Sequence, residues 1–216
     1  MELGKEQCFL DLITGVIDPG LRQRLVRYDP QSALDIGCGI GTTLVCLHYA
    51  LGIDRLEGIE IQTADAVLSG YNSFARAELK SEFSTIEEVW LAVTTDSSDV
   101  RPRITDAEQM KGLLSISYDT SIGVCDFSGE RYDLIILSNV LHYMYPHMIE
   151  HAFNKVRQLC HEHTLIYIRV KDDFKGSKVS SEVLLRYCRA FADERGLTEY
   201  AGGLSDEGAA FTFTNI

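Results

Sequence analysis

Short apolar runs recur along the chain and alternate with longer stretches in which apolar residues are spaced three or four positions apart. The short runs are typical of buried strands, and the longer stretches are typical of amphipathic helices. The expected strands are Ala33–Ile36, Leu56–Ile61, Ile122–Cys125, Leu134–Leu137 and Leu165–Val170. The expected helices are Thr42–Leu51, Ala64–Leu79, Pro146–Cys160 and Val183–Arg195. This alternation predicts βαβ units and a parallel sheet with helices on both faces.

Three segments depart from the alternation. Residues 1–30 carry helix-like apolar spacing, which predicts an N-terminal helical preface before a single domain over residues 31–216. The tail LTEYAGGLSDEGAAFTFTNI holds two β-prone runs around a Gly- and Asp-rich turn, so we expect a hairpin with at least one antiparallel strand. Residues 80–120, which include a predicted helix over Ala107–Leu114, far exceed the usual connection of ~2–6 residues. This insertion is either an added edge element or a lid over a substrate pocket.

Composition narrows the class of protein. The chain has 216 residues, of which 45% are hydrophobic and 24% charged, and this suits one globular domain. Its net charge of -12 disfavours a nucleic-acid partner, because phosphates are bound through Lys and Arg. The sequence has no secretory run and no apolar stretch near ~20 residues, so we expect a cytoplasmic protein without a membrane segment. The six cysteines include no Cys-x-x-Cys pair and predict reduced thiols.

The stretch ALDIGCGIGTT, residues 33–43, lies where a strand gives way to a helix. Its glycines allow positive φ and close approach of a ligand, while the helix N-terminus offers free N–H groups to an anion. The spacing Gly37-x-Gly39-x-Gly41 differs from the Gly-x-Gly-x-x-Gly of dinucleotide sites, and a Walker lysine is missing. The turn therefore predicts a ligand site, with phosphate binding as the less favoured interpretation and Cys38 inside the turn.

This turn, read with Asp35 as Asp-x-Gly-x-Gly-x-Gly, resembles the first motif of class I S-adenosylmethionine-dependent methyltransferases. LEGIEI resembles the family's second strand, and GVCDF and YDLIILSNVLHYM are similar to its third and fourth strands. The resemblance covers roughly residues 30–216 and implies S-adenosylmethionine as cofactor. It also implies a Rossmann-like, doubly wound α/β fold, with a seven-stranded, mostly parallel sheet and a reversed C-terminal strand.

The resemblance assigns roles to residues of this chain. Glu60 would hold the ribose hydroxyls, Asp126 would meet the adenine amino group, and Phe127 would lie beside the ring. The implied cofactor-binding residues are Asp35, Gly37, Cys38, Gly39, Gly41, Glu60, Ile61, Asp126, Phe127, Ser138 and Asn139. Elementary chemistry agrees at two points. A helix N-terminus suits the cofactor's carboxylate, with Asp35 toward its ammonium, and an acidic side chain can accept two bonds from a ribose diol.

Methyl transfer from a sulfonium is an in-line displacement that needs alignment, no metal and sometimes a base. His142 in SNVLHYMY is the candidate base, with shaping of the pocket as its alternative role, and Tyr143 and Tyr145 would line the same pocket. HMIEH at 147–151 matches an inverted zinc-peptidase motif, but the apolar spacing around it is that of an amphipathic helix. We therefore predict no metal site.

The loop Ser138-Asn139-Val140-Leu141 lacks the Asn/Asp-Pro-Pro-Tyr pattern of adenine and amide methyltransferases, and the chain has no Pro-Cys pair. What remains is an O, N or C acceptor, either on a small molecule or on a protein side chain. A catalytically silent cofactor-binding or partner subunit is the first alternative, and a nicotinamide oxidoreductase is the second. Whether the chain forms a homodimer stays open.

Overall fold

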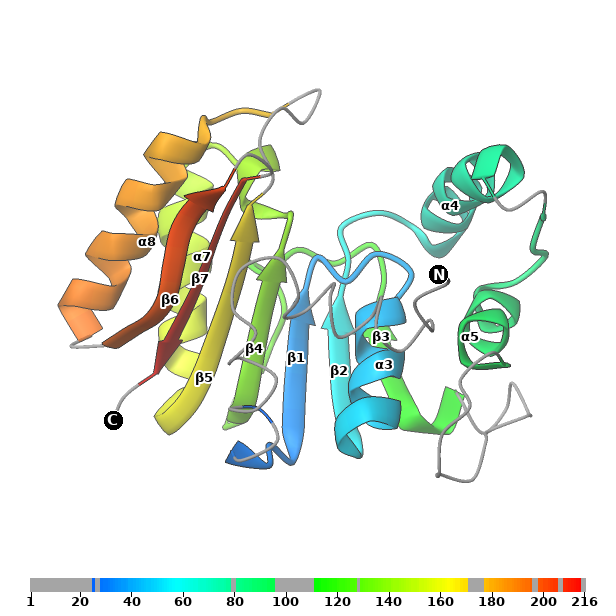
Figure 1. Cartoon of the computed structure of the whole chain (residues 1–216), viewed down its shortest axis with the longest axis horizontal. Coiled ribbons are helices and arrows are strands. Elements are labelled where there is room, and N and C mark those ends of the chain that lie inside the picture. The colour runs from blue at the N-terminus through cyan, green and yellow to red at the C-terminus, as the bar shows by residue number, and fades with distance from the viewer. Residues whose placement is uncertain are drawn as a thin grey trace.

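The computed structural model describes residues 25, 28–78, 81–95, 111–127, 129–170, 177–195, 198–205 and 208–214. Within these ranges the strands form one sheet in the order β3-β2-β1-β4-β5-β7-β6 (Figure 1). The strands are β1 Ser32–Ile36, β2 Arg55–Ile59, β3 Leu114–Ser117, β4 Tyr132–Ser138, β5 Cys160–Val170, β6 Thr198–Ser205 and β7 Gly208–Thr214. The helices are α3 Thr42–Leu51, α4 Ala64–Glu78, α5 Ile86–Thr95, α7 Pro146–Leu159 and α8 Ser181–Arg195, with a 3-10 turn, η2, over Leu141–Tyr143.

The first five strands are parallel, and the last two form an antiparallel hairpin. β1 pairs in parallel with β2 on one side and β4 on the other, β3 continues from β2, and β5 continues from β4. β7 runs antiparallel to β5, with Ile168 opposite Phe211, and antiparallel to β6, with Ser205 opposite Gly208. The arrowheads of β1, β4 and β5 therefore point to the same edge of the sheet (Figure 1).

Two hydrophobic cores lie on opposite faces of this sheet. Leu34 and Ile36 of β1 are buried with residues of α7 and α8, such as Phe153 and Phe191. Ala33, whose side chain points the other way, is buried with residues of α3 and α5. The parallel strands thus bury both of their faces, and the α/β Rossmann-like class predicted from the apolar runs is confirmed.

The helices follow the expected bounds closely. α3 begins at Thr42 and ends at Leu51, because Gly52 adopts φ 73° and donates its N–H to the carbonyl of His48 at 2.8 Å. Pro146 begins α7, where its missing N–H costs no helical bond. No described helix is long and apolar enough to cross a membrane.

The described part of the predicted insertion, residues 81–95 and 111–120, contributes to the domain core. The described residues between 81 and 120 include α5 and the edge strand β3, which pairs with β2 and is an added edge element of the kind that the first alternative describes. Trp90 of α5 is buried and its Nε1 donates to the carbonyl of Ile40 at 2.5 Å. A lid formed by residues 80–120 stays a prediction. Most of the helix predicted over 107–114, and residues 1–24 of the preface, lie outside the described residues.

The third strand was expected too far along the chain. Ile122–Val124 form a turn and Cys125 lies outside any strand, whereas β3 spans Leu114–Ser117. The expectation over 122–125 is therefore wrong. The backbone of this segment runs beside α7, where the Cys125 carbonyl accepts a hydrogen bond from Lys155 Nζ at 3.4 Å. Ile122 is buried against that helix, so its apolar character reflects packing on α7.

Candidate functional site

The glycine turn after β1 has the backbone conformation that its sequence predicts. Gly37, Gly39 and Gly41 have φ values of 76°, 56° and 82°, which L-residues with side chains rarely adopt. The N–H groups of Gly37 and Cys38 donate to the carbonyl of Ile59 at 2.8 and 3.1 Å. The turn is thereby fixed to the end of β2 before α3 begins.

The three glycines meet different surroundings. A Cβ on Gly37 would lie 2.5 Å from Val140 Cγ2, and one on Gly41 would lie 2.4 Å from Ile116 Cδ1. A Cβ on Gly39 would have no described atom within 4 Å. Packing therefore requires glycine at 37 and 41, while position 39 borders open space that a ligand can enter.

Glu60 ties the end of β2 to the glycine turn. The residue is 6% exposed, and its Oε2 accepts the Gly39 N–H at 2.9 Å while its Oε1 accepts the Gln62 N–H at 2.9 Å. Each carboxylate oxygen keeps a second lone pair, and these can accept hydroxyl groups from a ligand. Glu60 is thus held in place with acceptor capacity to spare.

The side chains of Asp35, which precedes the turn, and of Cys38, within the turn, are both buried. Burial, followed by repulsion from Glu60, raises the pKa of the fully buried Asp35 to about 7. Burial, together with the carboxylates of Asp35 and Glu60, also raises the pKa of the Cys38 thiol. Cys38 is therefore a small packing side chain without thiolate reactivity, and neither residue lines the cavity that opens beside the turn.

A cavity of about 720 Å³ opens at the carboxyl edge of the sheet, within the usual ~300–1,000 Å³ of ligand sites. It lies where the strand order reverses, between β1 with β2 on one side and β4 on the other. Its lining residues are Ile36, Gly37, Ile59, Glu60, Ile61, Gln62, Thr120, Ser121, Ile122, Gly123, Asn139, Val140, Tyr143, Met144, His147, Met148 and His151. Gly37, Glu60, Ile61, Asn139 and Tyr143 of the predicted site therefore meet here.

The residues that follow β4, Asn139 and Val140, line the cavity with their backbone and with the amide side chain of Asn139. Asn139 has φ 56° and donates its N–H to the carbonyl of Arg169 at 2.7 Å, so the left-handed turn is anchored to β5. Val140 follows it into the cavity, where it also packs against the Gly37 position. Ser138, by contrast, is half-buried and outside the lining.

Tyr143 lines the cavity as expected, whereas His142 does not. The His142 ring is 1% exposed and outside the cavity lining, and burial lowers its pKa. Its carbonyl accepts the Lys178 N–H at 2.7 Å and the Ser177 hydroxyl at 3.3 Å, which fixes η2 to the segment before α8. Tyr143 is 48% exposed and lines the cavity, with its ring centroid 4.0 Å from that of His142. His142 thus lies in the wrong place for a base and instead supports Tyr143.

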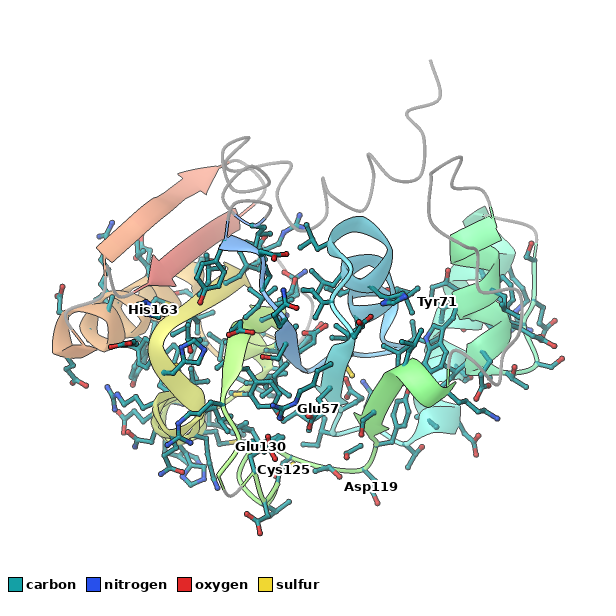
Figure 2. The ribbon with its side chains drawn as sticks, turned by 90° about the horizontal axis from the view of Figure 1, so that it is seen from below. Glu57, Tyr71, Asp119, Cys125, Glu130 and His163 are labelled. Carbon is teal, nitrogen blue, oxygen red and sulfur yellow. The ribbon has the colours of Figure 1, made fainter. Side chains whose placement is uncertain are left out.

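Asp126 and Phe127 do not lie at the cavity. Asp126 is exposed, and Phe127 packs edge to face on Tyr132 at 6.2 Å. Asp126 and Phe127 lie away from the cavity because β3 ends at Ser117, earlier than expected. By residue 126 the chain has left the edge of the sheet and runs beside α7. The acidic residue that does follow β3 is Asp119, which donates its N–H to the carbonyl of Gln62 at 3.1 Å. Figure 2 shows Asp119 apart from Cys125, the residue just before Asp126.

The wall formed by α7 is the part of the site that sequence reasoning missed. Met144, His147, Met148 and His151 line the cavity, whereas Ile149 on the other face of α7 is buried in the core. A signal was present, since His147 and His151 are four residues apart on the polar face of a helix that follows the β4 loop. Among the described residues no group of three His, Cys, Asp or Glu side chains could hold a metal ion.

Solved structures with the same fold are methyltransferases. The methyltransferase domain of bacterial CtHen1-C is 13% identical over 98% of both chains, with a TM-score of 0.58. A TehB-like S-adenosylmethionine-dependent methyltransferase from Corynebacterium glutamicum is 15% identical, with a TM-score of 0.53. The alignment covers 100% of this chain and 89% of that protein. Magnesium protoporphyrin IX methyltransferase from Synechocystis, solved with bound S-adenosylmethionine, is 12% identical over 98% of this chain and 80% of its own, with a TM-score of 0.55.

Sequence comparison adds nothing to this likeness. No family model matches the sequence, and the comparison with curated proteins gives no match. At these identities the similarity is one of fold, and the chain has the fold of class I S-adenosylmethionine-dependent methyltransferases.

Proposed function

We propose that this chain, which has the class I methyltransferase fold, transfers a methyl group from S-adenosylmethionine to an O, N or C atom of a small molecule. The observation that carries the proposal is the hydrogen bond from Gly39 to Glu60, a side chain that lines the cavity. Gly39 borders open space, and Glu60 is held against it by a hydrogen bond of 2.9 Å. A single site thus offers close backbone approach beside a carboxylate acceptor, which a nucleoside carrying an amino-acid arm requires.

The described residues fit this cofactor along the edge of the sheet. The turn at Gly37 and Gly39 and the N-terminus of α3 would hold the amino-acid arm, and Glu60 would accept the ribose hydroxyls. Ile61, which is 61% exposed, and Thr120 would flank the base. We propose Asp119, in place of Asp126, as the acidic residue near the adenine amino group, because it directly follows β3.

The cofactor supplies an electrophilic methyl group on its sulfonium. The chain positions the cofactor. The glycine turn and Glu60 are already joined by a hydrogen bond before the ligand binds, so the site is formed in advance. Alignment of this kind can lower the barrier by ~7–11 kcal/mol. The net charge of -12 favours a neutral or cationic acceptor over an anionic one.

The arrangement of the sheet supports the same proposal. The expected fold ends in a reversed strand, and β7 runs antiparallel to both β5 and β6. We propose methyl transfer as the activity of this seven-stranded domain.

The proposal is tested by incubating the purified chain and methyl-labelled S-adenosylmethionine with a cell extract, then separating small molecules from protein. Label in the small-molecule fraction supports the proposal. Label in the protein fraction would instead favour the protein side-chain methyltransferase. Cofactor binding without transfer to either fraction would favour the silent subunit, and preferential binding of NAD would favour the oxidoreductase.

A further inference from the structure

Exposed apolar side chains gather around the mouth of the cavity. Among the described residues, the large hydrophobic side chains that remain exposed are Ile61, Val124, Tyr143, Tyr145 and Met148. Three of them line the cavity, Tyr145 directly precedes α7, and Val124 follows the lining residue Gly123. Exposed apolar surface concentrated at one opening marks a binding site for an apolar partner.

Among the described lining residues, the α7 side of the cavity is apolar and aromatic, with two histidines and no Asp, Glu, Lys or Arg side chain. Tyr143, Met144 and Met148 provide most of it, with His147 and His151 on the same face of the helix. Ile149, Ala152, Phe153 and Val156 on the opposite face are buried, which holds the wall rigid against the sheet. A flat, apolar molecule can therefore pack against a surface that is formed in advance.

Charge limits the acceptor further. Glu60 is the only Asp, Glu, Lys or Arg among the described lining residues, and the cofactor's ribose would occupy it. A carboxylate or phosphate on the acceptor would find no Lys or Arg there to pair with. An uncharged aromatic ring suits the wall best, because Tyr143 can stack on it and methionine sulfur packs well against ring edges.

The two histidines differ in position. His151 faces the loop after β3, since a Cβ on Gly123 would lie 3.3 Å from its Nε2. His147 lies one helical turn closer to the end of β4, and its exposed ring stacks in parallel with Tyr145 at a centroid distance of 6.1 Å. Its charged or titratable surroundings are His151 and Glu150 on α7, Glu60 across the cavity, and Lys178, whose Nζ lies 5.7 Å from the Tyr145 ring centroid. His147 is thus the histidine nearer the mouth.

Resting on the proposed function, we propose that the acceptor is an uncharged planar aromatic compound with an ionisable hydroxyl, bound against Tyr143 and Met148, and that His147 takes its proton. A lone pair of the hydroxyl oxygen forms the new bond to the methyl carbon. The bond between that carbon and sulfur breaks, and its electron pair stays on sulfur, which becomes a thioether. The hydroxyl proton passes to the imidazole of His147 and then to solvent.

The first test uses 4-nitrophenol, whose phenol and phenolate forms absorb at different wavelengths, added to the protein saturated with S-adenosylhomocysteine. We expect binding, with a larger phenolate fraction on the protein than in buffer at the same pH. Tyr143→Ala and Met148→Ala should each weaken nitrophenol binding about tenfold or more while the affinity for S-adenosylhomocysteine stays the same. Equal nitrophenol affinity in these variants and wild type would overturn the acceptor site.

The second test separates proton acceptance from packing. His147→Gln should bind nitrophenol within about threefold of wild type, lose the excess phenolate, and slow methylation of nitrophenol roughly 10²-fold. It should also alter the acidic limb of the pH–rate profile, where a general base becomes protonated. His163→Gln is the matched control, because His163 lies on β5 outside the cavity lining and is exposed (Figure 2). Identical phenolate fractions and pH profiles in the two variants would overturn the role of His147.

These outcomes stay distinct from failure of the proposed function. If S-adenosylhomocysteine itself does not bind, the proposed function fails. If it binds and nitrophenol does not bind to the complex, the methyltransferase proposal stands and the aromatic acceptor is wrong.

Discussion

The Glu60 carboxylate accepts a hydrogen bond from the backbone N–H of Gly39, with 2.9 Å between Oε2 and N. This contact joins the end of β2 to the glycine turn after β1, at the switch point of the sheet. The same carboxylate accepts the Gln62 N–H through its other oxygen, so its orientation is fixed before any ligand arrives. Two parts of the site that sequence motifs treat separately are therefore one hydrogen-bonded unit.

Replacing Glu60 should weaken the binding of S-adenosylhomocysteine and loosen the turn. Glu60→Ala removes the acceptors for the ribose hydroxyls and leaves the Gly39 N–H without its partner. We expect a loss of about 1–3 kcal/mol, or roughly 10- to 100-fold in affinity, measured by calorimetry. Glu162→Ala is the control, because that side chain is exposed on β5. Equal affinities for the two variants would remove Glu60 from the site.

The three glycines of the turn should respond differently to substitution. Gly37→Ala and Gly41→Ala place a Cβ about 2.5 Å from Val140 and Ile116 in strained backbone, and should cost roughly 2–4 kcal/mol of unfolding free energy. Gly39→Ala should lower the free energy of unfolding by only ~1–2 kcal/mol, the cost of placing an alanine in the left-handed conformation. Gly39→Arg should keep the fold and abolish cofactor binding. Thermal unfolding and ligand titration measure these effects, and full binding by a folded Gly39→Arg would rule out ligand approach at this turn.

Asp35 should make the unliganded protein less stable as the pH rises. Its pKa in the folded chain is about 7, while the unfolded value is near ~4, so the unfolded state releases its proton first. Below pH ~4 the titration of Asp35 does not change the free energy of unfolding. Between pH ~4 and ~7 the free energy of unfolding falls by a few kcal/mol, at ~1.4 kcal/mol per pKa unit. Asp35→Asn cannot titrate, so its stability relative to wild type should increase over this range. The same stability difference at pH 4 and pH 8 in chemical denaturation would contradict this.

Asp35 does not line the cavity, but the resemblance places the cofactor's ammonium toward it. If the ammonium reaches the Asp35 carboxylate through the glycine turn, binding should reverse the preference of Asp35 for its neutral form. Below pH ~7 the cofactor should then displace a proton, which calorimetry detects as a binding heat that depends on the ionisation heat of the buffer. Asp35→Asn should show less of this dependence and weaker affinity.

Asp119 and Asp126 offer a direct comparison of the two alignments of the third strand. Asp119→Ala should lower the affinity for S-adenosylhomocysteine roughly tenfold, since one hydrogen bond to a ligand contributes about 0.5–1.5 kcal/mol. Asp126→Ala should leave the affinity unchanged, because Asp126 follows the turn beside α7, whereas Asp119 directly precedes the lining residue Thr120. The opposite ranking would restore the original assignment of Asp126.

The elements that the sequence predicts best are those with a local cause. The glycine turn and the bounds of α3 follow from backbone preferences of Gly41 and Gly52, and both lie where expected. β3 was missed because Leu114–Ser117 is short and only Leu114 is fully buried, while the more apolar run at Ile122 packs on α7. Apolar character alone does not distinguish a sheet strand from a segment buried beside a helix.

The candidate site shows the same division. Glu60 and Asn139 could be predicted, because they end strands whose order is fixed by the motifs. The burial of His142 outside the cavity could not be predicted, since His142 and Tyr143 belong to one 3-10 turn and tertiary packing decides which ring is buried. His147 and His151 lie on a polar helix face that the sequence does show. That this face borders a cavity depends on where residues 120–123 pack.

The measurement that tests the central claim most directly is a calorimetric titration of the purified chain with S-adenosylhomocysteine, with NAD as the control ligand and Glu60→Ala as the control protein. We predict micromolar binding of the adenosyl compound at one site, weak or no binding of NAD, and a loss of roughly 10- to 100-fold in the variant. Tighter binding of NAD, or no binding of S-adenosylhomocysteine by the folded wild-type chain, would contradict the account.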